Sequence, residues 1–159
     1  MDRARIRPVV DDRGFSLIEL MVVVLIIAIL LAIAVPSFMA ASHRAADRAA
    51  QSNARNAHVT QMIVYADGER FTSDVAQLQL GDSSLAYTRV LANMTAEGKV
   101  VYVQMLPDTW HVDDTVLVGV KSASGNCFWI RTTGGTNQLR FAANDCTAIP
   151  ASGSYAEEW

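Results

Sequence analysis

The sequence predicts an α+β protein in which one long N-terminal helix packs against an antiparallel sheet of about four strands. Two observations carry this prediction. A long apolar run near the N-terminus passes into an alanine-rich helical pattern, and the second half of the chain holds short runs of Val, Ile, Tyr, Phe and Trp separated by turn residues. With 159 residues, 51% of them hydrophobic and 18% charged, the chain is expected to form one small globular unit and one membrane segment.

The apolar run extends from Phe15 to Val35 and is long enough for a bilayer. Its 21 residues reach about 30 Å as a helix, the thickness of a hydrocarbon core. Glu19 lies inside this run, where a carboxylate costs roughly a few kcal/mol. No nearby residue of the segment carries the opposite charge, so Glu19 is expected to need a partner from elsewhere.

The hexapeptide Gly14-Phe15-Ser16-Leu17-Ile18-Glu19, followed by this run, resembles the class III signal of type IV prepilins and secretion pseudopilins. The resemblance covers residues 13–36. It implies that a prepilin peptidase cuts between Gly14 and Phe15 and that the new N-terminus at Phe15 is methylated. It also implies that Glu19 is the assembly carboxylate, which meets the freed amine of another copy.

Three segments follow from this interpretation. Residues 1–14 form the removed leader, 15–67 form the helix with its transmembrane half at 15–35, and 68–159 form the globular head. The leader carries four arginines, which favour its retention in the cytoplasm and place the head outside.

Two other interpretations of the apolar run are open. A conventional secretory signal is suggested by Ala32-Ile33-Ala34, which fits an A-x-A cleavage site, but the run exceeds the usual ~7–15 residues and contains a glutamate. A single-span anchor for an extracellular binding domain explains the length and leaves Glu19 without a purpose.

Beyond the apolar run, Pro36 predicts a kink in the helix because proline removes one backbone hydrogen bond. The helix is then alanine-rich, which permits close approach of neighbouring elements. Apolar residues at i, i+3, i+4 and i+7 predict the face that packs on the core: Val59, Met62, Ile63 and Ala66. Gly68 is the expected stop signal.

The head is predicted to hold one short helix and a meander of strands. The helix starts at Thr72-Ser73-Asp74 and runs through Leu78. The strand-like runs are Tyr87–Leu91, Val100–Leu106, Thr115–Lys121, Cys127–Thr132 and Gln138–Phe141. Ala148 to Trp159 reads as a tail from which Tyr155 and Trp159 could fold back. This arrangement resembles the pilin fold, and residues 125–131 resemble the cysteine-closed end of bacterial major pilins.

The two cysteines, Cys127 and Cys146, favour a disulfide, because an even count is typical of exported domains. Such a bond would stabilise the head by roughly 3 kcal/mol in the chain-entropy model; two buried free thiols are the alternative. His111 with Asp113 and Asp114 matches no dedicated metal-binding loop. We therefore expect no metal, no cofactor and no catalytic site, and the chain is not expected to be an enzyme.

Charge gives a weak constraint on partners. The formal net charge is −3, and removal of the leader takes away four arginines and three aspartates, which leaves −4. No strongly basic face is implied, although nucleic acid is not excluded as a partner.

The expected function is that of a type IV pilus subunit, held in the cytoplasmic membrane before assembly and then built into an extracellular filament for adhesion, motility or DNA uptake. The expected partners are other copies of the chain, the prepilin peptidase, the assembly platform and minor pilins. A pseudopilin of a type II secretion machine is the principal alternative.

Overall fold

The computed structural model describes residues 14–106, 115–135 and 137–149. The elements in chain order are α1 (Leu17–Gly68), α2 (Val75–Gly81), β1 (Ala86–Thr88), the 3-10 helix η1 (Leu91–Asn93), β2 (Val100–Met105), β3 (Thr115–Lys121), β4 (Cys127–Thr133) and β5 (Asn137–Ala143). The chain divides into two compact units, with the boundary between Met39 and Ala40 inside α1.

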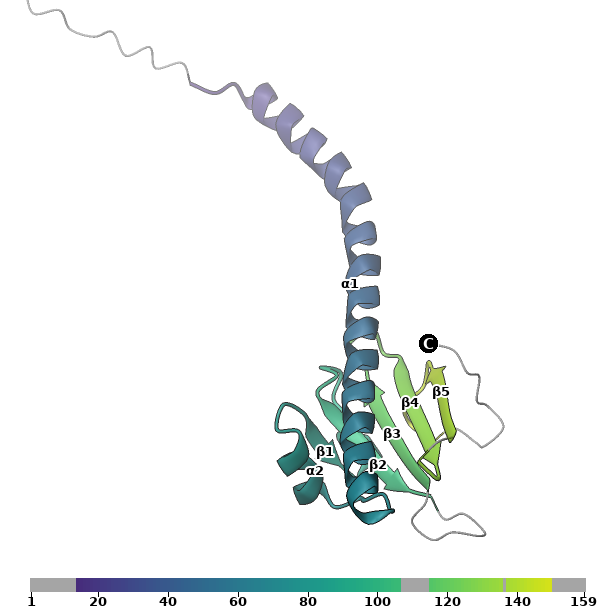
Figure 1. Cartoon of the computed structure of the whole chain (residues 1–159). Helices are drawn as coiled ribbons and strands as arrows, with labels where there is room; N and C mark the ends of the chain where they lie inside the picture. The colour runs from purple at the N-terminus through teal and green to yellow at the C-terminus, as the bar shows by residue number, and fades with distance from the viewer. Residues whose placement is uncertain (1–13, 107–114, 136, 150–159) are drawn as a thin grey trace, which may run out of the picture. The chain divides into compact units, whose positions relative to one another are not determined.

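The predicted α+β class and the long N-terminal helix are confirmed, and the arrangement matches the pilin fold (Figure 1). The strand count differs from the expected four, since five strands form one sheet in the order β1-β2-β3-β4-β5. β2 to β5 make an antiparallel meander, but β1 pairs with β2 in parallel. The parallel pairing requires a crossover, and the stretch between Thr88 and Val100, which contains η1, supplies it.

The predicted strand at Tyr87–Leu91 ends early, at Thr88, because a local hydrogen bond turns the chain. The backbone N–H of Val90 donates to the Thr88 Oγ1 at 3.1 Å, an arrangement in which a side chain competes with the sheet for the backbone. The short helix after Thr72 is confirmed as α2, and Asp74 is its N-cap, accepting from the backbone N–H of Ala76 at 2.9 Å.

The core lies on both faces of the sheet. On the face that α1 covers, alternate residues of β2, β3 and β4 are buried together with Ala50, Ala54 and Ala57 of the helix. The opposite face carries a second cluster that includes Tyr102, Leu117, Trp129 and Phe141. β3 is the central strand, and its residues from Thr115 to Val120 are all buried.

A close approach of the Trp129 ring to the backbone of Gly119 allows the second cluster to form. Gly119 lies opposite Trp129 in the β3–β4 register, and a Cβ on Gly119 would come within 2.4 Å of the indole ring. Trp129 therefore lies over the Gly119 backbone, stacked on Phe141 with ring centroids 6.1 Å apart. Glycine is required at position 119 for space rather than for an unusual backbone angle.

The predicted packing face of α1 is wrong in all but one residue: Met62 packs, partly buried, against the core, but Ala66 is exposed. Val59 and Ile63 are 55% and 58% exposed, whereas the buried positions are Ala50, Ala54, Ala57, Thr60 and Gln61. Small side chains let the helix backbone approach the sheet closely, so alanines occupy the contact and the larger aliphatic residues face away from it. Gln61 is tolerated there because its side chain bonds both the N–H and the C=O of Thr72, at 3.2 and 2.7 Å.

Candidate assembly site

The residues assigned to cleavage and methylation lie just before α1 begins. Gly14 and Phe15 precede the helix, and both are exposed, Phe15 to 80%. Leader residues 1–13 lie outside the described part of the chain. Both residues that flank the peptide bond between Gly14 and Phe15 are therefore accessible, as a peptidase needs. The cut and the methylation stay predictions.

Glu19 has a partner that the sequence interpretation did not foresee. The backbone N–H of Ser16 donates to Glu19 Oε2 at 3.0 Å, which places Ser16 as the N-cap of α1 and Glu19 at the third helical position. This is one half of a capping box, whose sequence signature is S-x-x-E. This neutral backbone donor does not supply the opposite charge that Glu19 is expected to need, so that expectation stays a prediction; the helix N-terminus adds a favourable contact for the carboxylate.

The surroundings of Glu19 are apolar. A groove of about 390 Å³ along the helix surface is lined by Phe15, Ile18, Glu19, Val22 and Val23. A second groove of about 520 Å³ follows it and is lined only by apolar residues between Leu20 and Ala28. The carboxylate is therefore a single polar group on a surface that otherwise favours lipid or another apolar helix.

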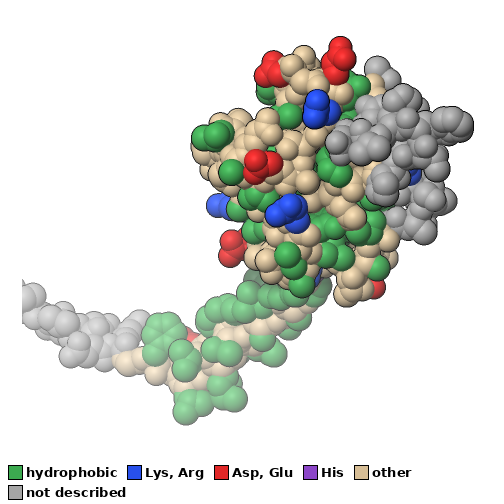
Figure 2. Space-filling model, turned by 90° about the horizontal axis from the view of Figure 1, so that it is seen from below, with side chains coloured by type: hydrophobic (Ala, Val, Ile, Leu, Met, Phe, Trp, Pro, Cys, Tyr) green, Lys and Arg blue, Asp and Glu red, His purple; other side chains and the backbone are tan. Residues whose placement is uncertain are grey.

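α1 is long and apolar enough in its first part to cross a membrane. The large hydrophobic residues from Phe15 to Met39 are all exposed, and green side chains cover this part of the helix in Figure 2. Pro36 lies inside α1 and cannot donate a hydrogen bond to the carbonyl of Ala32. The kink itself stays a prediction.

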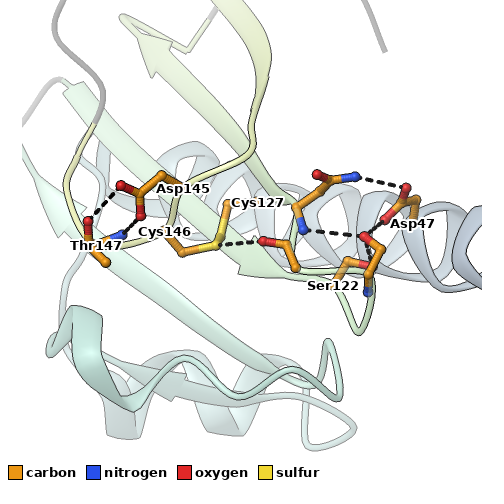
Figure 3. Close-up of a disulfide and its surroundings, with 9 residues drawn as sticks. Asp47, Ser122, Cys127, Asp145, Cys146 and Thr147 are labelled. Atoms are coloured by element: carbon orange, nitrogen blue, oxygen red, sulfur yellow. Dashed lines mark hydrogen bonds between the residues drawn. A yellow bond between two sulfur atoms is a disulfide. The ribbon is translucent and has the colours of Figure 1, made fainter.

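The disulfide predicted between Cys127 and Cys146 is present, with the Cα atoms 5.7 Å apart. Cys127 begins β4 opposite Ala143 in the register with β5, so the bond fastens the chain just beyond β5 to the start of β4 (Figure 3). Cys146 Sγ also contacts the carbonyl oxygen of Gly125 at 3.4 Å. The segment after β5 is therefore held against the turn that joins β3 to β4.

The turn between β3 and β4 is itself hydrogen-bonded to α1. Asp47 accepts hydrogen bonds from Ser124 Oγ and, at 3.1 Å, from Asn126 Nδ2. Partial burial acts to raise the pKa of Asp47, but hydrogen bonds from Ser124, Ser122 and Asn126, with His43 nearby, outweigh it and hold the pKa below its usual value. Asp47 is thus an ionised group turned toward the head.

The described residues gather no group of three or more His, Cys, Asp and Glu that could hold a metal ion. His111, Asp113 and Asp114, considered for such a site, lie outside the described residues, as do Tyr155 and Trp159. His58 is half-buried and bonded to Thr132 Oγ1 at 2.7 Å, and His43 is exposed on α1.

Comparison with known protein families gives one match. Residues 11–35 match the model of the prokaryotic N-terminal methylation motif. This range contains Gly14, Phe15, Glu19 and the whole apolar run from Phe15 to Val35. Neither the curated proteins nor the solved structures gave a match to the chain.

Proposed function

Because the chain carries the class III signal of type IV pilin-like prepilins, we propose that it is a structural subunit of a type IV pilus that polymerises through α1 into a surface filament. One observation supports this most directly. The signal opens a helix whose large hydrophobic residues stay exposed as far as Met39, and so large an apolar surface needs a cover. The cytoplasmic membrane covers it before assembly, with the head outside, and the helices of other copies cover it in the filament.

The geometry at Glu19 supports a role in assembly. Ser16 occupies only Oε2, and a carboxylate can accept further hydrogen bonds at its other oxygen. Cleavage between Gly14 and Phe15 leaves the N–H of Ser16 intact, so the cap persists in the processed chain. The freed amine of another copy can then bind Oε1 in apolar surroundings, where a charge-assisted contact is strong and fixes the axial register.

Prepilin peptidase, the assembly platform and minor pilins are the proposed partners of this process. N-terminal sequencing and mass measurement of the processed chain test its first step. The expected start is N-methylated Phe15. A start at Met1 or at Val35 contradicts the proposal, because the first means no processing and the second means a conventional signal.

Substitutions at Glu19 test the second step. Glu19→Gln keeps an acceptor for the N–H of Ser16, which the capping box also accepts, and removes only the charge. We expect Glu19→Gln to lower filament yield by about tenfold or more, since loss of a charge pair of 1.4 kcal/mol already has that effect. The matched control is Glu69→Gln, an exposed glutamate beyond the C-terminal end of α1. A processed Glu19→Gln chain that builds wild-type filaments in electron microscopy contradicts the charge pairing.

Secretion pseudopilins carry the same signal at their N-terminus, so a role in type II secretion is the alternative. Deletion of the gene separates the two. Loss of surface filaments with secretion intact supports the pilus subunit, whereas loss of secretion with filaments intact supports the pseudopilin.

A further inference from the structure

Two arginines form a basic pair on α1 shortly after its apolar part. Arg44 and Arg48 are four positions apart, so they lie on the same side of the helix, and both are exposed. Within the part of the chain that the structure describes, neither guanidinium takes part in a hydrogen bond or an ion pair. Among the described residues they are therefore two charges on one face without an ion-pair partner.

The acid best placed to neutralise them is committed elsewhere. Between Ala40 and Ala66 the only acidic residue is Asp47. Its two carboxylate oxygens accept from Ser124 and Asn126 of the β3–β4 turn, so the carboxylate points into the head (Figure 3). Contacts within the head therefore hold the acid away from the arginines.

The position of the pair along the chain fits the headgroup layer of a membrane. Phe38 and Met39 are the last exposed large hydrophobic residues of the apolar part. At ~1.5 Å per residue, Arg44 follows Met39 by roughly 7.5 Å of helix and Arg48 by roughly 13 Å. A headgroup layer is about 5–8 Å thick on each side of the hydrocarbon, and arginine side chains bend toward it from beyond.

We propose that Arg44 and Arg48 bind the phosphate of an anionic phospholipid on the face of the membrane where the head lies, while the chain awaits assembly. This inference rests on the first stage of the proposed function, in which the chain is held in the membrane, and not on the filament. A guanidinium matches phosphate with two parallel hydrogen bonds, and two guanidinia one helical turn apart can share one phosphate. A zwitterionic headgroup binds less well, because its own ammonium opposes the arginines.

Lipid selectivity of the full chain tests this inference. The purified chain is placed in phosphatidylcholine vesicles, and spin-labelled phosphatidylglycerol is compared with spin-labelled phosphatidylcholine for association with the protein by electron spin resonance. We expect the wild-type chain to prefer phosphatidylglycerol by about fivefold or more, from the usual attraction of one arginine near an anionic surface. The preference should weaken as salt is added.

The decisive variant is Arg44→Gln with Arg48→Gln. It should bring the ratio of phosphatidylglycerol to phosphatidylcholine association down toward one, which means no selectivity. The matched control is Arg70→Gln with Arg89→Gln, two exposed arginines of the head that change the charge equally; it should keep the wild-type preference. Equal affinity of the wild-type chain for both lipids overturns the inference, and so does an Arg44/Arg48 variant that behaves like the control.

Filament formation by the same variants separates this inference from the proposed function. A wild-type chain that selects phosphatidylglycerol but builds no filament upholds the lipid site and contradicts the pilus subunit. An Arg44/Arg48 variant that keeps its lipid preference and loses filaments shows that the arginines contact a second copy of the chain, and it overturns the lipid site.

Discussion

The two parts of α1 differ in what covers their side chains. From Gly14 to Ala45 every residue is exposed, although most are apolar. Between Ala50 and Gln61 the helix instead buries a regular face made of small and polar residues. The first part depends on something outside the chain to cover it, and the second is already covered by the sheet of its own head.

The difference teaches that hydrophobicity and burial are separate properties of this helix. Its most apolar residues contribute nothing to the folded core of the described chain, while alanines pack it against the sheet and Gln61 bonds it to Thr72, shortly before α2. The side chains of Asn53 and His58 add bonds to the head, to the Gly98 carbonyl at 2.8 Å and to Thr132 at 2.7 Å. Stability of the head should therefore respond to substitutions in the second part and not in the first.

The largest expected contrast is between two leucines that undergo the same change. Leu78 of α2 is 0% exposed and Leu25 is 60% exposed. Leu78→Ala leaves a cavity and should lower the free energy of unfolding by about 2–5 kcal/mol. Leu25→Ala should change it by less than about 0.5 kcal/mol. Urea unfolding of the full chain in detergent measures both, and similar losses in the two variants would mean that the exposed apolar part of α1 contributes to stability as much as the buried core of the head does.

A second contrast enlarges two alanines of α1. Ala54 is fully buried against the sheet, and Ala28 is exposed in the apolar part. Ala54→Leu forces the helix away from the sheet and should cost about 1–3 kcal/mol, whereas Ala28→Leu should leave the head unaffected. Near-ultraviolet circular dichroism with urea unfolding gives the comparison. A tolerated leucine at position 54 contradicts the close approach of helix and sheet.

The sequence predicted the elements of this fold better than their contacts. Length and unbroken apolarity are properties of the chain alone, so the membrane segment followed directly, and β-branched and aromatic runs located β2, β3, β4 and β5. The face of α1 could not be obtained in this way. A periodic pattern at Val59 and Ile63 selects the largest apolar residues, but close contact with a sheet selects the smallest.

The candidate site was predicted in part for the same reason. The signal around Glu19 is a local pattern, and the S-x-x-E spacing of Ser16 and Glu19 could have revealed the capping bond. The bonds between Asp47 and the turn at Ser124 and Asn126 join residues more than 70 positions apart. No local pattern predicts such a contact, because it depends on how the sheet is placed against the helix.

The two ends of α1 offer a third, smaller contrast. Glu19 caps the N-terminus in favourable geometry, whereas Glu69, just after the C-terminus, has φ of 52°. Residues with a Cβ are strained in this left-handed region, and glycine is not. Glu69→Gly should therefore raise the free energy of unfolding by about 1 kcal/mol. Glu97→Gly is the control, because Glu97 lacks a positive φ and glycine there only loosens the unfolded chain. Equal effects of the two substitutions contradict the strain.

The smallest expected effect concerns His58, which belongs to the covered part of α1. Burial lowers the pKa of its imidazole from the usual 6.5, and the charge of Arg140 lowers it further. The unfolded chain therefore binds a proton more readily than the folded one, so stability is complete above the unfolded pKa and falls as the pH drops through about 6.5.

The urea midpoint should consequently decrease between about pH 7.5 and pH 5. His58→Gln keeps a hydrogen-bonding group for Thr132 and removes the proton equilibrium, so its midpoint should stay flatter over this range. Asp47 does not interfere, because its pKa lies below the ordinary 3.8. His43, on the exposed face of α1, provides the matched control, and His43→Gln should keep the wild-type dependence. A flat wild-type profile, or the same slope in all three chains, would mean that His58 is as well hydrated as the uncovered face of the helix.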